Sequence, residues 1–578
     1  MPLIRKHAAA AALLFALAAA FVSPYLLPVD PDSAAFRTAA YPAVLLFCSF
    51  MPAGGALRRA SRRTLVCGLA MGLLFAAALS LGAELTFYGG LLPGRGSLVR
   101  RITVPFMAAP LLGCLFARLM LLRVRSRQSG RASLLPYAAV LFLLWLPVLL
   151  AYFPGMLNYD FAGEYAQHTE GVYSSIHPLL HSVLMNGALA LGERLMSLSA
   201  GLLFLSLVQM VLFALALGRA CAFIRRRAGL TPALLATAFF GLHPVFSTLS
   251  CSMTKDTLFA AAVLTLSLDV WEMIEGKAPS RWGILRFVLC TVAAALLRTN
   301  GFVALALLFP GFIAARRGKR KSAALLCAAS LLSTFTVMGG LQLAMHPVSF
   351  PSFQFYSLPA QQLVRANAAG TLTAQQQETL RSWYTDEAGL VVHPHLADPA
   401  KGYLDRQRLE REGRSFLSLW LEAGKTSALP YAEAFLMLNS GSWYPDDKSH
   451  ATIYPDVSWN DKGYLQTQEL EIEGFSFRCF LPSLRSFMER VCRRNEYQKW
   501  PVVSLLFSPA LPFWALVFAC FVMIARRRGP FIPAALGALG LWAGYLLGPC
   551  TLPRYALPLF CLAPALLAGA LALPFREN

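Results

Sequence analysis

Two carboxylates that follow a long apolar run are the first candidates for chemistry in this sequence. Asp160 and Glu164 lie one helical turn apart, so both carboxyl groups can share one face of a helix. An ionisable group beside the hydrocarbon layer of a membrane is a candidate functional group. Asp160 has an equally good structural interpretation as a helix N-cap or a turn residue.

Two histidines follow in the same polar stretch. His177 and His181 have the spacing i, i+4, which brings both imidazoles to one side of a helix and would suit a metal ion. Because no clear third ligand accompanies them, we favour no metal site, and we expect His177 and Pro178 to begin a helix.

Three basic positions are expected on the same side of a membrane. Lys255 and Asp256 begin one apolar run, and Arg298 lies in a turn between two short runs. Arg554 and Tyr555 begin the last run. Snorkelling to the interface accounts equally well for Lys255 and Arg554, whereas the short runs around Arg298 would hold that side chain deeper. Several cations at one depth, facing an acid, would form a pocket for a lipid phosphate.

The composition decides which class of protein must hold these residues in place. Of the 578 residues, 57% are apolar and 14% are charged, and the mean hydropathy is +0.54. An ordinary soluble protein has about 25% charged residues, so these values exclude a water-soluble globular protein. A disordered chain would need the opposite balance. We therefore expect an all-α polytopic membrane protein.

Fourteen apolar runs are suitable for membrane-spanning helices. Clusters of Arg and Lys occupy alternate loops, which places these loops and both termini in the cytoplasm of a multi-pass cell-membrane protein. The same clusters account for the net charge of +21, so we do not expect nucleic-acid binding. The runs fall near residues 7–28, 39–57, 64–84, 102–122, 133–152, 198–222, 231–248, 256–274, 283–297, 301–315, 322–344, 501–525, 531–550 and 555–573.

These runs and the polar segments divide the chain into four parts. Residues 1–132 contain four N-terminal transmembrane helices, and residues 133–345 form the membrane core with a first external loop at 153–197. Residues 346–499 are polar and near neutral, and their length suits one small, mainly helical extracytoplasmic domain. Residues 500–578 contain three C-terminal transmembrane helices.

One stretch of the core is too long for one span and too short for two. Residues 283–315 predict two helices of about 15 residues, each covering about 22 Å of a hydrocarbon layer about 30 Å thick. The turn Arg298-Thr299-Asn300-Gly301 should therefore lie at or beneath the outer interface, facing protein or water.

The order of these motifs is similar to that of a known superfamily. In chain order the motifs are Asp160, His177-Pro178-Leu179, Lys255-Asp256, Leu296-Leu297-Arg298-Thr299-Asn300-Gly301, Ser357–Arg365 and Gly441–Asp446. The chain resembles the GT-C glycosyltransferases, multi-pass enzymes that use polyprenyl-phosphate-linked sugars, and more closely a bacterial branch of them. The resemblance covers about residues 133–573, so the first four expected helices lie outside it.

The resemblance implies both a fold and a reaction. It implies a GT-C-like membrane core and an inverting transfer of a sugar from a polyprenyl-phosphate carrier to a cell-envelope glycan or glycolipid. An acidic residue of the first external loop serves as general base in GT-C enzymes, and this role maps onto Asp160. The leaving phosphate needs cations, for which Lys255, Arg298 and Arg554 are the candidates.

The same resemblance suggests roles for the remaining residues. Asp256, Asn300 and Tyr555 would complete the substrate site, and His177 and His181 would shape the loop or contact phosphate.

The sequence departs from the superfamily at the acidic position. Many GT-C members have an adjacent acidic pair, whereas Tyr159 and Phe161 flank Asp160 here. Glu164 would then take the second acidic position, which leaves the identity of the base and any requirement for a divalent metal open.

A transporter or flippase of lipid-linked sugars is the alternative function. It would use the same phosphate-binding cations but would need no general base. Transporters often contain paired inverted repeats, and the sequence shows none, which favours the enzyme. A non-catalytic scaffold is a third interpretation, but it would leave Asp160 and Arg298 unexplained.

Overall fold

The computed structural model describes residues 60–124, 132–158, 160–348, 353–447, 474–500 and 503–575. The first two expected spans, near 7–28 and 39–57, lie outside these residues. Within the described residues the chain is almost entirely helical, and its only sheet pairs two short strands, β1 (Met156–Leu157) and β2 (Ser252–Met253). The expected all-α fold is confirmed.

Several helices have the length and apolarity of membrane spans. Among the described residues six helices qualify singly, and α11 (Leu230–Leu242) with α12 (Pro244–Ser250) would be a seventh, broken span with a bend of 57°. The chain is therefore a helical protein whose apolar helices suit a membrane. The six are α5 (Arg62–Tyr88), α6 (Arg95–Leu121), α10 (Leu198–Ala228), α13 (Lys255–Ile274), α16 (Arg320–Met345) and α27 (Pro553–Ala572).

Shorter helices complete the bundle and its connections. The expected break in the core is confirmed, because α14 (Arg281–Leu296) ends before Arg298 and α15 (Gly301–Ala315) begins after it. The expected run at 501–525 is interrupted, since a non-helical step at Ser508-Pro509 separates its two helices. The others are α7 (Leu135–Ala151), α8 (Phe161–Thr169), α9 (Leu179–Leu195), α23 (Pro482–Met488), α24 (Val503–Phe507), α25 (Ala510–Ala525) and α26 (Pro533–Tyr545).

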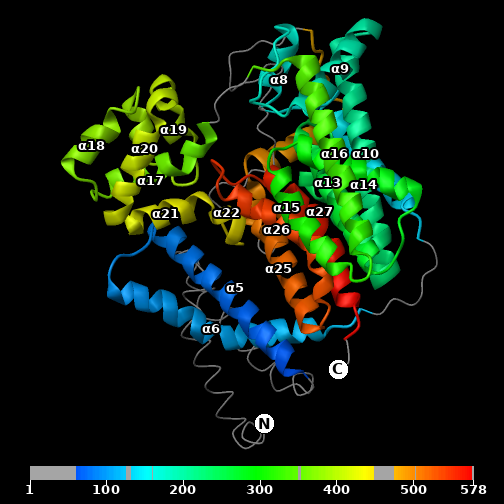
Figure 1. Ribbon diagram of the computed structural model, residues 1–578, viewed down its shortest axis with the longest axis horizontal. Coiled ribbons are helices and arrows are strands. Elements are labelled where there is room, and N and C mark those ends of the chain that lie inside the picture. The colour runs from blue at the N-terminus through cyan, green and yellow to red at the C-terminus, as the bar shows by residue number, and fades with distance from the viewer. Residues whose placement is uncertain are drawn as a thin grey trace, which may run out of the picture.

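The helices of residues 357–443, which are most of those described in the expected polar domain, form a separate group that we call the polar unit. The expected domain of residues 346–499 is not a single group, because α23 packs against α7 of the bundle and the Arg478 and Phe480 N–H groups donate to Phe153 O and Leu150 O. Figure 1 shows the polar unit beside the main bundle, with α5 and α6 running from beneath it toward the C-terminal end of α27. The helices of the polar unit are α17 (Ser357–Ala368), α18 (Ala374–Arg381), α19 (Asp398–Gly402), α20 (Arg406–Thr426), α21 (Ala428–Leu438) and α22 (Ser440–Trp443).

Close packing of small residues joins α5 to α6. A Cβ atom on Gly72 would lie 2.5 Å from the backbone nitrogen of Gly113, so the two backbones meet at a distance that only glycine allows. The hairpin that results carries its own ion pair, with Arg101 Nη2 2.7 Å from Glu84 Oε1.

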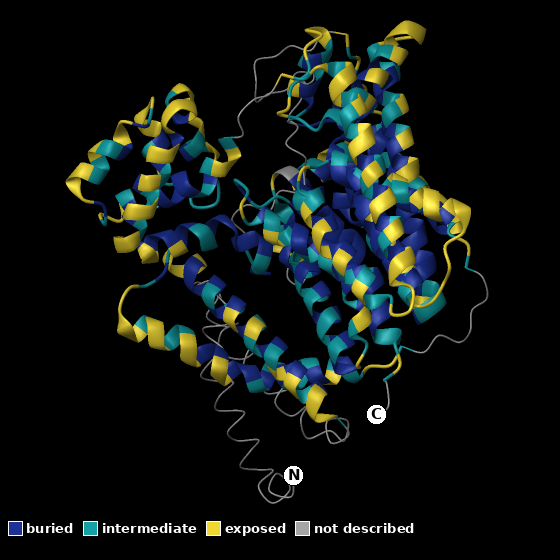
Figure 2. Ribbon diagram, in the orientation of Figure 1, coloured by how far each residue is buried: buried dark blue, intermediate teal, exposed yellow. Residues whose placement is uncertain are grey.

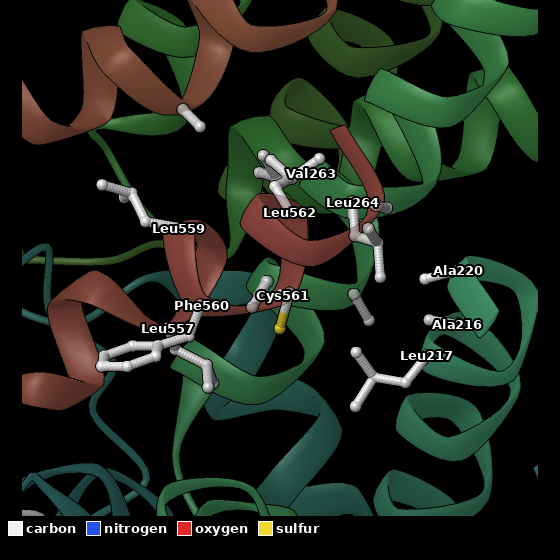
Figure 3. Close-up of a cluster of buried hydrophobic side chains, with 14 of the residues drawn as sticks. Ala216, Leu217, Ala220, Val263, Leu264, Leu557, Leu559, Phe560, Cys561 and Leu562 are labelled. Atoms are coloured by element: carbon white, nitrogen blue, oxygen red, sulfur yellow. The ribbon is translucent and has the colours of Figure 1, made fainter. Parts of the chain in front are cut away.

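The two helices at the centre of the bundle are α13 and α27. In the most apolar 18 residues of each helix, 83% are buried in α13 and 67% in α27. The same share is 17% in α16, which lies at the outside of the bundle (Figure 2). Figure 3 shows the contact, in which Leu557–Leu562 of α27 lie among Val263 and Leu264 of α13 and Ala216–Ala220 of α10. Because both central helices are held on all sides, the residues at their N-terminal ends have fixed positions.

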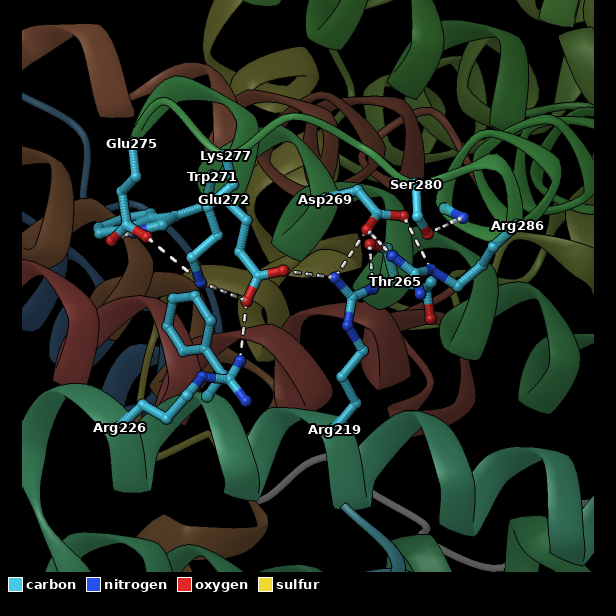
Figure 4. Close-up of polar contacts among 12 residues, drawn as sticks. Arg219, Arg226, Thr265, Asp269, Trp271, Glu272, Glu275, Lys277, Ser280 and Arg286 are labelled. Carbon is cyan, nitrogen blue, oxygen red and sulfur yellow. Dashed lines mark hydrogen bonds and ion pairs between the residues drawn. The ribbon is translucent and has the colours of Figure 1, made fainter. Parts of the chain in front are cut away.

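A buried ion-pair network joins α10, α13 and α14 far from those ends. Arg219 Nη2 lies 2.7 Å from Asp269 Oδ1 and 3.2 Å from Glu272 Oε2, and Arg286 Nε donates to Asp269 Oδ2 at 3.2 Å (Figure 4). Arg226 pairs with the other oxygen of Glu272 at 2.7 Å. Each buried charge therefore has a partner of opposite sign, as burial requires.

Removing Asp269 from this network should destabilise the fold. Asp269→Asn removes the carboxylate that the largely buried Arg219 contacts, which costs about 3–5 kcal/mol for a buried pair. The Arg286 side chain is 44% exposed, so the loss of its pair adds about 0–1 kcal/mol. We expect a clear fall in the apparent Tm of the protein in detergent. Asp398→Asn is the control, because its pair with Lys401 is half exposed on the Asp398 side and is worth about 0–1 kcal/mol. Equal Tm changes in the two variants would contradict a structural role for the network.

Candidate functional site

The short parallel pairing of β1 with β2 brings two distant loops together. Met156 pairs with Ser252 and Leu157 with Met253, and the two strands run in the same direction. Residues that follow each strand therefore leave the pair on the same side. Asp160 follows β1 and Lys255 follows β2. Their side chains are therefore in direct contact, although 95 residues separate them in the sequence.

A buried glutamine in α10 holds the second of these loops. Gln209 Nε2 donates to the carbonyl oxygens of Leu249 at 3.2 Å, Ser250 at 3.0 Å and Ser252 at 2.7 Å. Thr254 then caps α13, because its hydroxyl accepts from the backbone N–H of Asp256. The start of α13 is thereby fixed with the Lys255 side chain toward the first loop.

One carboxylate and two cations form the centre of the site. Lys255 Nζ lies 2.9 Å from Asp160 Oδ2, and Arg554 Nη1 donates to the same oxygen at 3.3 Å. Lys255 Nζ is also 3.7 Å from Glu164 Oε1. Lys255 and Arg554 are 9% and 8% exposed, so both charges are largely removed from solvent. The carboxylate and cations that the sequence predicted as neighbours therefore lie together.

Glu164 faces the two histidines. His181 Nδ1 lies 2.5 Å from Glu164 Oε2, and His177 Nδ1 lies 3.8 Å from Glu164 Oε1. Asn186 donates to the backbone oxygen of Glu164 at 3.1 Å. The expected helix start is confirmed, since α9 begins after Pro178. In the described part of the chain no group of three His, Cys, Asp or Glu side chains is suited to a metal ion.

Arg298 joins the same end of the bundle through a second buried pair. Arg298 Nε lies 2.8 Å from Asp256 Oδ1, while Asp256 Oδ2 accepts from the Thr254 hydroxyl at 3.0 Å. Two cations contact the Tyr555 ring, whose centroid lies 4.7 Å from the Arg298 guanidinium and 5.2 Å from that of Arg554. Cation–π contact with one ring thus brings Arg298 beside Arg554.

Asn300 is the one predicted site residue that the structure leaves apart from this cluster. It precedes α15 and its side chain does not cap that helix. Among the described residues no ion pair or side-chain hydrogen bond joins Asn300 to the other site residues.

The charges of the site control its ionisation. Burial by itself raises the pKa of Asp160, but the charges of Lys255 and Arg554 outweigh burial and hold this pKa well below its ordinary range. Burial likewise raises the pKa of Glu164, and His181 and Lys255 more than offset it. Burial and the charge of Lys255 lower the pKa of His177, although both carboxylates oppose this change. At neutral pH the two carboxylates are therefore ionised and His177 is neutral.

Sequence reasoning missed the groups that support the site. Gln209, Tyr545 and Asn186 were not singled out, although Gln209 gave a usable signal as a polar residue inside a long apolar run. The Tyr545 ring, 5.8 Å from the Arg298 guanidinium, gave none, because an aromatic residue near a helix end is common.

Mild acid should destabilise the protein through His177. Its pKa in the folded chain lies below the ordinary value of 6.5, so only the unfolded chain takes up the proton as the pH first falls. Stability therefore decreases below about pH 6.5. His177→Gln should reduce the loss of apparent Tm between about pH 7 and 5.5, whereas His393→Gln, in the polar unit, should not. Identical pH profiles for wild type and His177→Gln would refute this assignment.

Comparison with known proteins gives one match. A model for a family of unknown function, DUF6020, matches residues 165–572. The match includes the histidines and all the site cations, and it begins directly after Glu164. No curated protein and no solved structure matches the chain. Because the match spans more than half of the 578 residues, the chain belongs to the DUF6020 family, whose function is unknown.

Proposed function

We propose that the protein is a membrane glycosyltransferase of the GT-C type. It transfers a sugar from a polyprenyl-phosphate carrier to a cell-envelope glycan or glycolipid. The observation that carries the proposal is the buried cluster in which Asp160 contacts Lys255 and Arg554, with Arg298 beside them. Several cations together can bind a phosphate, and a carboxylate nearby can accept the proton of an acceptor hydroxyl.

The proposal includes an orientation in the membrane. The fourteen apolar runs all cross the bilayer, both termini are cytoplasmic, and residues 346–499 are extracytoplasmic. The N-terminal ends of α13 and α27 then lie near the outer surface, where a lipid phosphate and a water-soluble acceptor can meet. The buried charge network of Arg219 and Asp269 lies toward the cytoplasmic ends of the same bundle.

In the proposed reaction the carrier phosphate competes with Asp160 for its cations. Without carrier, Lys255 and Arg554 pair with Asp160 and keep its pKa low, which makes the carboxylate a weak base. A phosphate that binds Lys255, Arg298 and Arg554 draws these charges away from Asp160. The pKa of Asp160 then rises toward the value that general-base catalysis requires.

The chemical step balances with these groups alone. The acceptor hydroxyl oxygen forms a bond to the anomeric carbon, and its proton passes to Asp160. The bond from the anomeric carbon to the phosphate oxygen breaks on the opposite face, so the configuration inverts. The leaving phosphate keeps the electron pair, and Lys255, Arg298 and Arg554 stabilise its charge.

Glu164 has a different part in this proposal. His181 holds one of its oxygens at 2.5 Å, so Glu164 fixes the position of α8 against α9. It also contributes negative charge 3.7 Å from Lys255 Nζ, which keeps this cation in place when phosphate replaces Asp160 as its partner.

Replacing Asp160 should separate binding from catalysis. Asp160→Asn cannot accept the acceptor proton, so transfer should fall about 100-fold or more. Carrier should bind at least as tightly as to wild type, because the anion that competes for Lys255 and Arg554 is gone. The measurement uses purified protein in lipid nanodiscs, a radiolabelled polyprenyl-phosphate sugar and an envelope acceptor, with Asp398→Asn as control. Undiminished transfer by Asp160→Asn would show that Asp160 is not the base. If wild-type protein in vesicles moved the carrier across the bilayer but transferred no sugar, this result would favour the flippase.

Removing one cation should weaken carrier binding. The double variant Asp160→Asn/Lys255→Gln is compared with Asp160→Asn, because Arg554 lacks the Asp160 carboxylate in both and the two proteins differ only in the Lys255 cation. Loss of one charged hydrogen bond to phosphate should raise the Kd for polyprenyl phosphate about 10- to 100-fold relative to Asp160→Asn. Lys425→Gln, at an exposed position of α20, is the matched control. An unchanged Kd in the double variant would show that Lys255 does not bind phosphate.

A further inference from the structure

The loop between α26 and α27 (residues 546–552) carries site residues at both of its ends. Tyr545 is the last residue of α26, and Arg554 and Tyr555 belong to the first turn of α27. The loop has no regular structure of its own apart from turns at its start. Its position therefore depends on what contacts it from outside.

One part of the polar unit binds the middle of this loop through backbone groups. The Ala397 N–H donates to Pro549 O at 2.8 Å, and Leu396 forms an isolated antiparallel bridge with Cys550. Cys550 is 8% exposed and lies in the contact. These bonds pin the loop to the segment that precedes α19.

A second part of the polar unit binds both ends of the loop. Asn439 Nδ2 donates to Leu546 O at 3.0 Å, and the hydroxyls of Ser442 and Thr551 lie 3.1 Å apart. Asn439 and Ser442 are 1% and 6% exposed, so neither bond competes with bulk water. A Cβ atom on Gly441 would lie 3.1 Å from Thr551 Cγ2, which shows how closely the backbone of α22 approaches the loop.

Two indole groups hold α22 itself in place. Trp542 Nε1 of α26 donates to Ser442 O at 2.9 Å, and Trp514 Nε1 of α25 donates to Trp443 O at 2.8 Å. The cavity that remains between Ser442, Thr551, Tyr545 and Tyr555 has a volume of about 10 Å³. This space admits one water molecule at most, so the polar unit packs tightly against the start of α27.

We infer that the polar unit is a positioning element for Arg554, with Asn439, Ser442 and Thr551 as the positioning residues. Their hydrogen bonds hold the loop, and the loop holds the first turn of α27. Arg554 is thereby kept where its guanidinium reaches Asp160 and stacks beside Tyr555. The assignment of phosphate as the ligand of Arg554 rests on the proposed function, whereas the positioning of the loop does not.

A single hydroxyl tests this inference. Thr551→Val keeps the approximate size of the side chain but removes the hydroxyl, with its hydrogen bonds to Ser442 Oγ and Leu438 O. Thr551→Ser keeps the hydroxyl. The matched control is Thr334→Val in α16, because Thr334 is fully buried and its hydroxyl donates to Ser330 O of its own helix. All variants are full-length protein in nanodiscs, and apparent Tm values establish that each is folded.

Two measurements give distinguishable outcomes. In Thr551→Val, amide hydrogen exchange of residues 546–556 should quicken several-fold, and the Kd for polyprenyl phosphate should rise about 5- to 100-fold. Thr551→Ser and Thr334→Val should match wild type in both. Unchanged exchange in a folded Thr551→Val protein would overturn the inference, whatever the Kd. Faster exchange in a protein that binds no polyprenyl phosphate even as wild type would overturn the proposed function and leave the positioning supported.

Discussion

Three carboxylates and three cations lie together in a largely buried site only because each charge has a neighbour of opposite sign. They are Asp160, Glu164, Asp256, Lys255, Arg298 and Arg554. Removing an ion from water costs several kcal/mol, and attraction at close range repays this cost only if the geometry is good. The contacts of Lys255 and Arg554 with Asp160, and of Arg298 with Asp256, meet this condition. The rest of the structure holds these six charges, which come from four segments of the chain, in fixed relative positions.

Three devices provide that register. The pairing of β1 with β2 sets the loop of Asp160 beside the start of α13. Gln209 donates to three carbonyl groups, two at the end of α12 and one in β2. The polar unit holds the loop before Arg554. Each device joins parts of the chain that are far apart in sequence, which explains why a site built on helix ends remains rigid.

A site with balanced charges differs from an open anion pocket. Without ligand the cations are already neutralised, so their burial is stable and no excess positive field attracts unrelated anions. In the proposed reaction, a ligand phosphate displaces a carboxylate from them, and that displacement would free the carboxylate to accept a proton. Binding and activation of the base would thus be one event.

From the amino-acid order alone one can infer a helical, membrane-suited chain, the break around Arg298, the start of α9 and most members of the charged cluster. These features depend on composition, on local periodicity and on breakers such as Pro178 and Gly301, which act over a few residues. Gln209 stands out as a polar residue in an apolar run, but the carbonyl groups that it binds cannot be inferred in this way. Neither can the position of Tyr545 beside Arg298 or the hydrogen bond between Ser442 and Thr551. Asn300 was expected in the cluster, yet no side-chain bond joins it to the other site residues among the described residues. Only the folded chain reveals these partners, because they depend on which helix ends and loops meet across hundreds of residues, and that is a matter of packing in three dimensions.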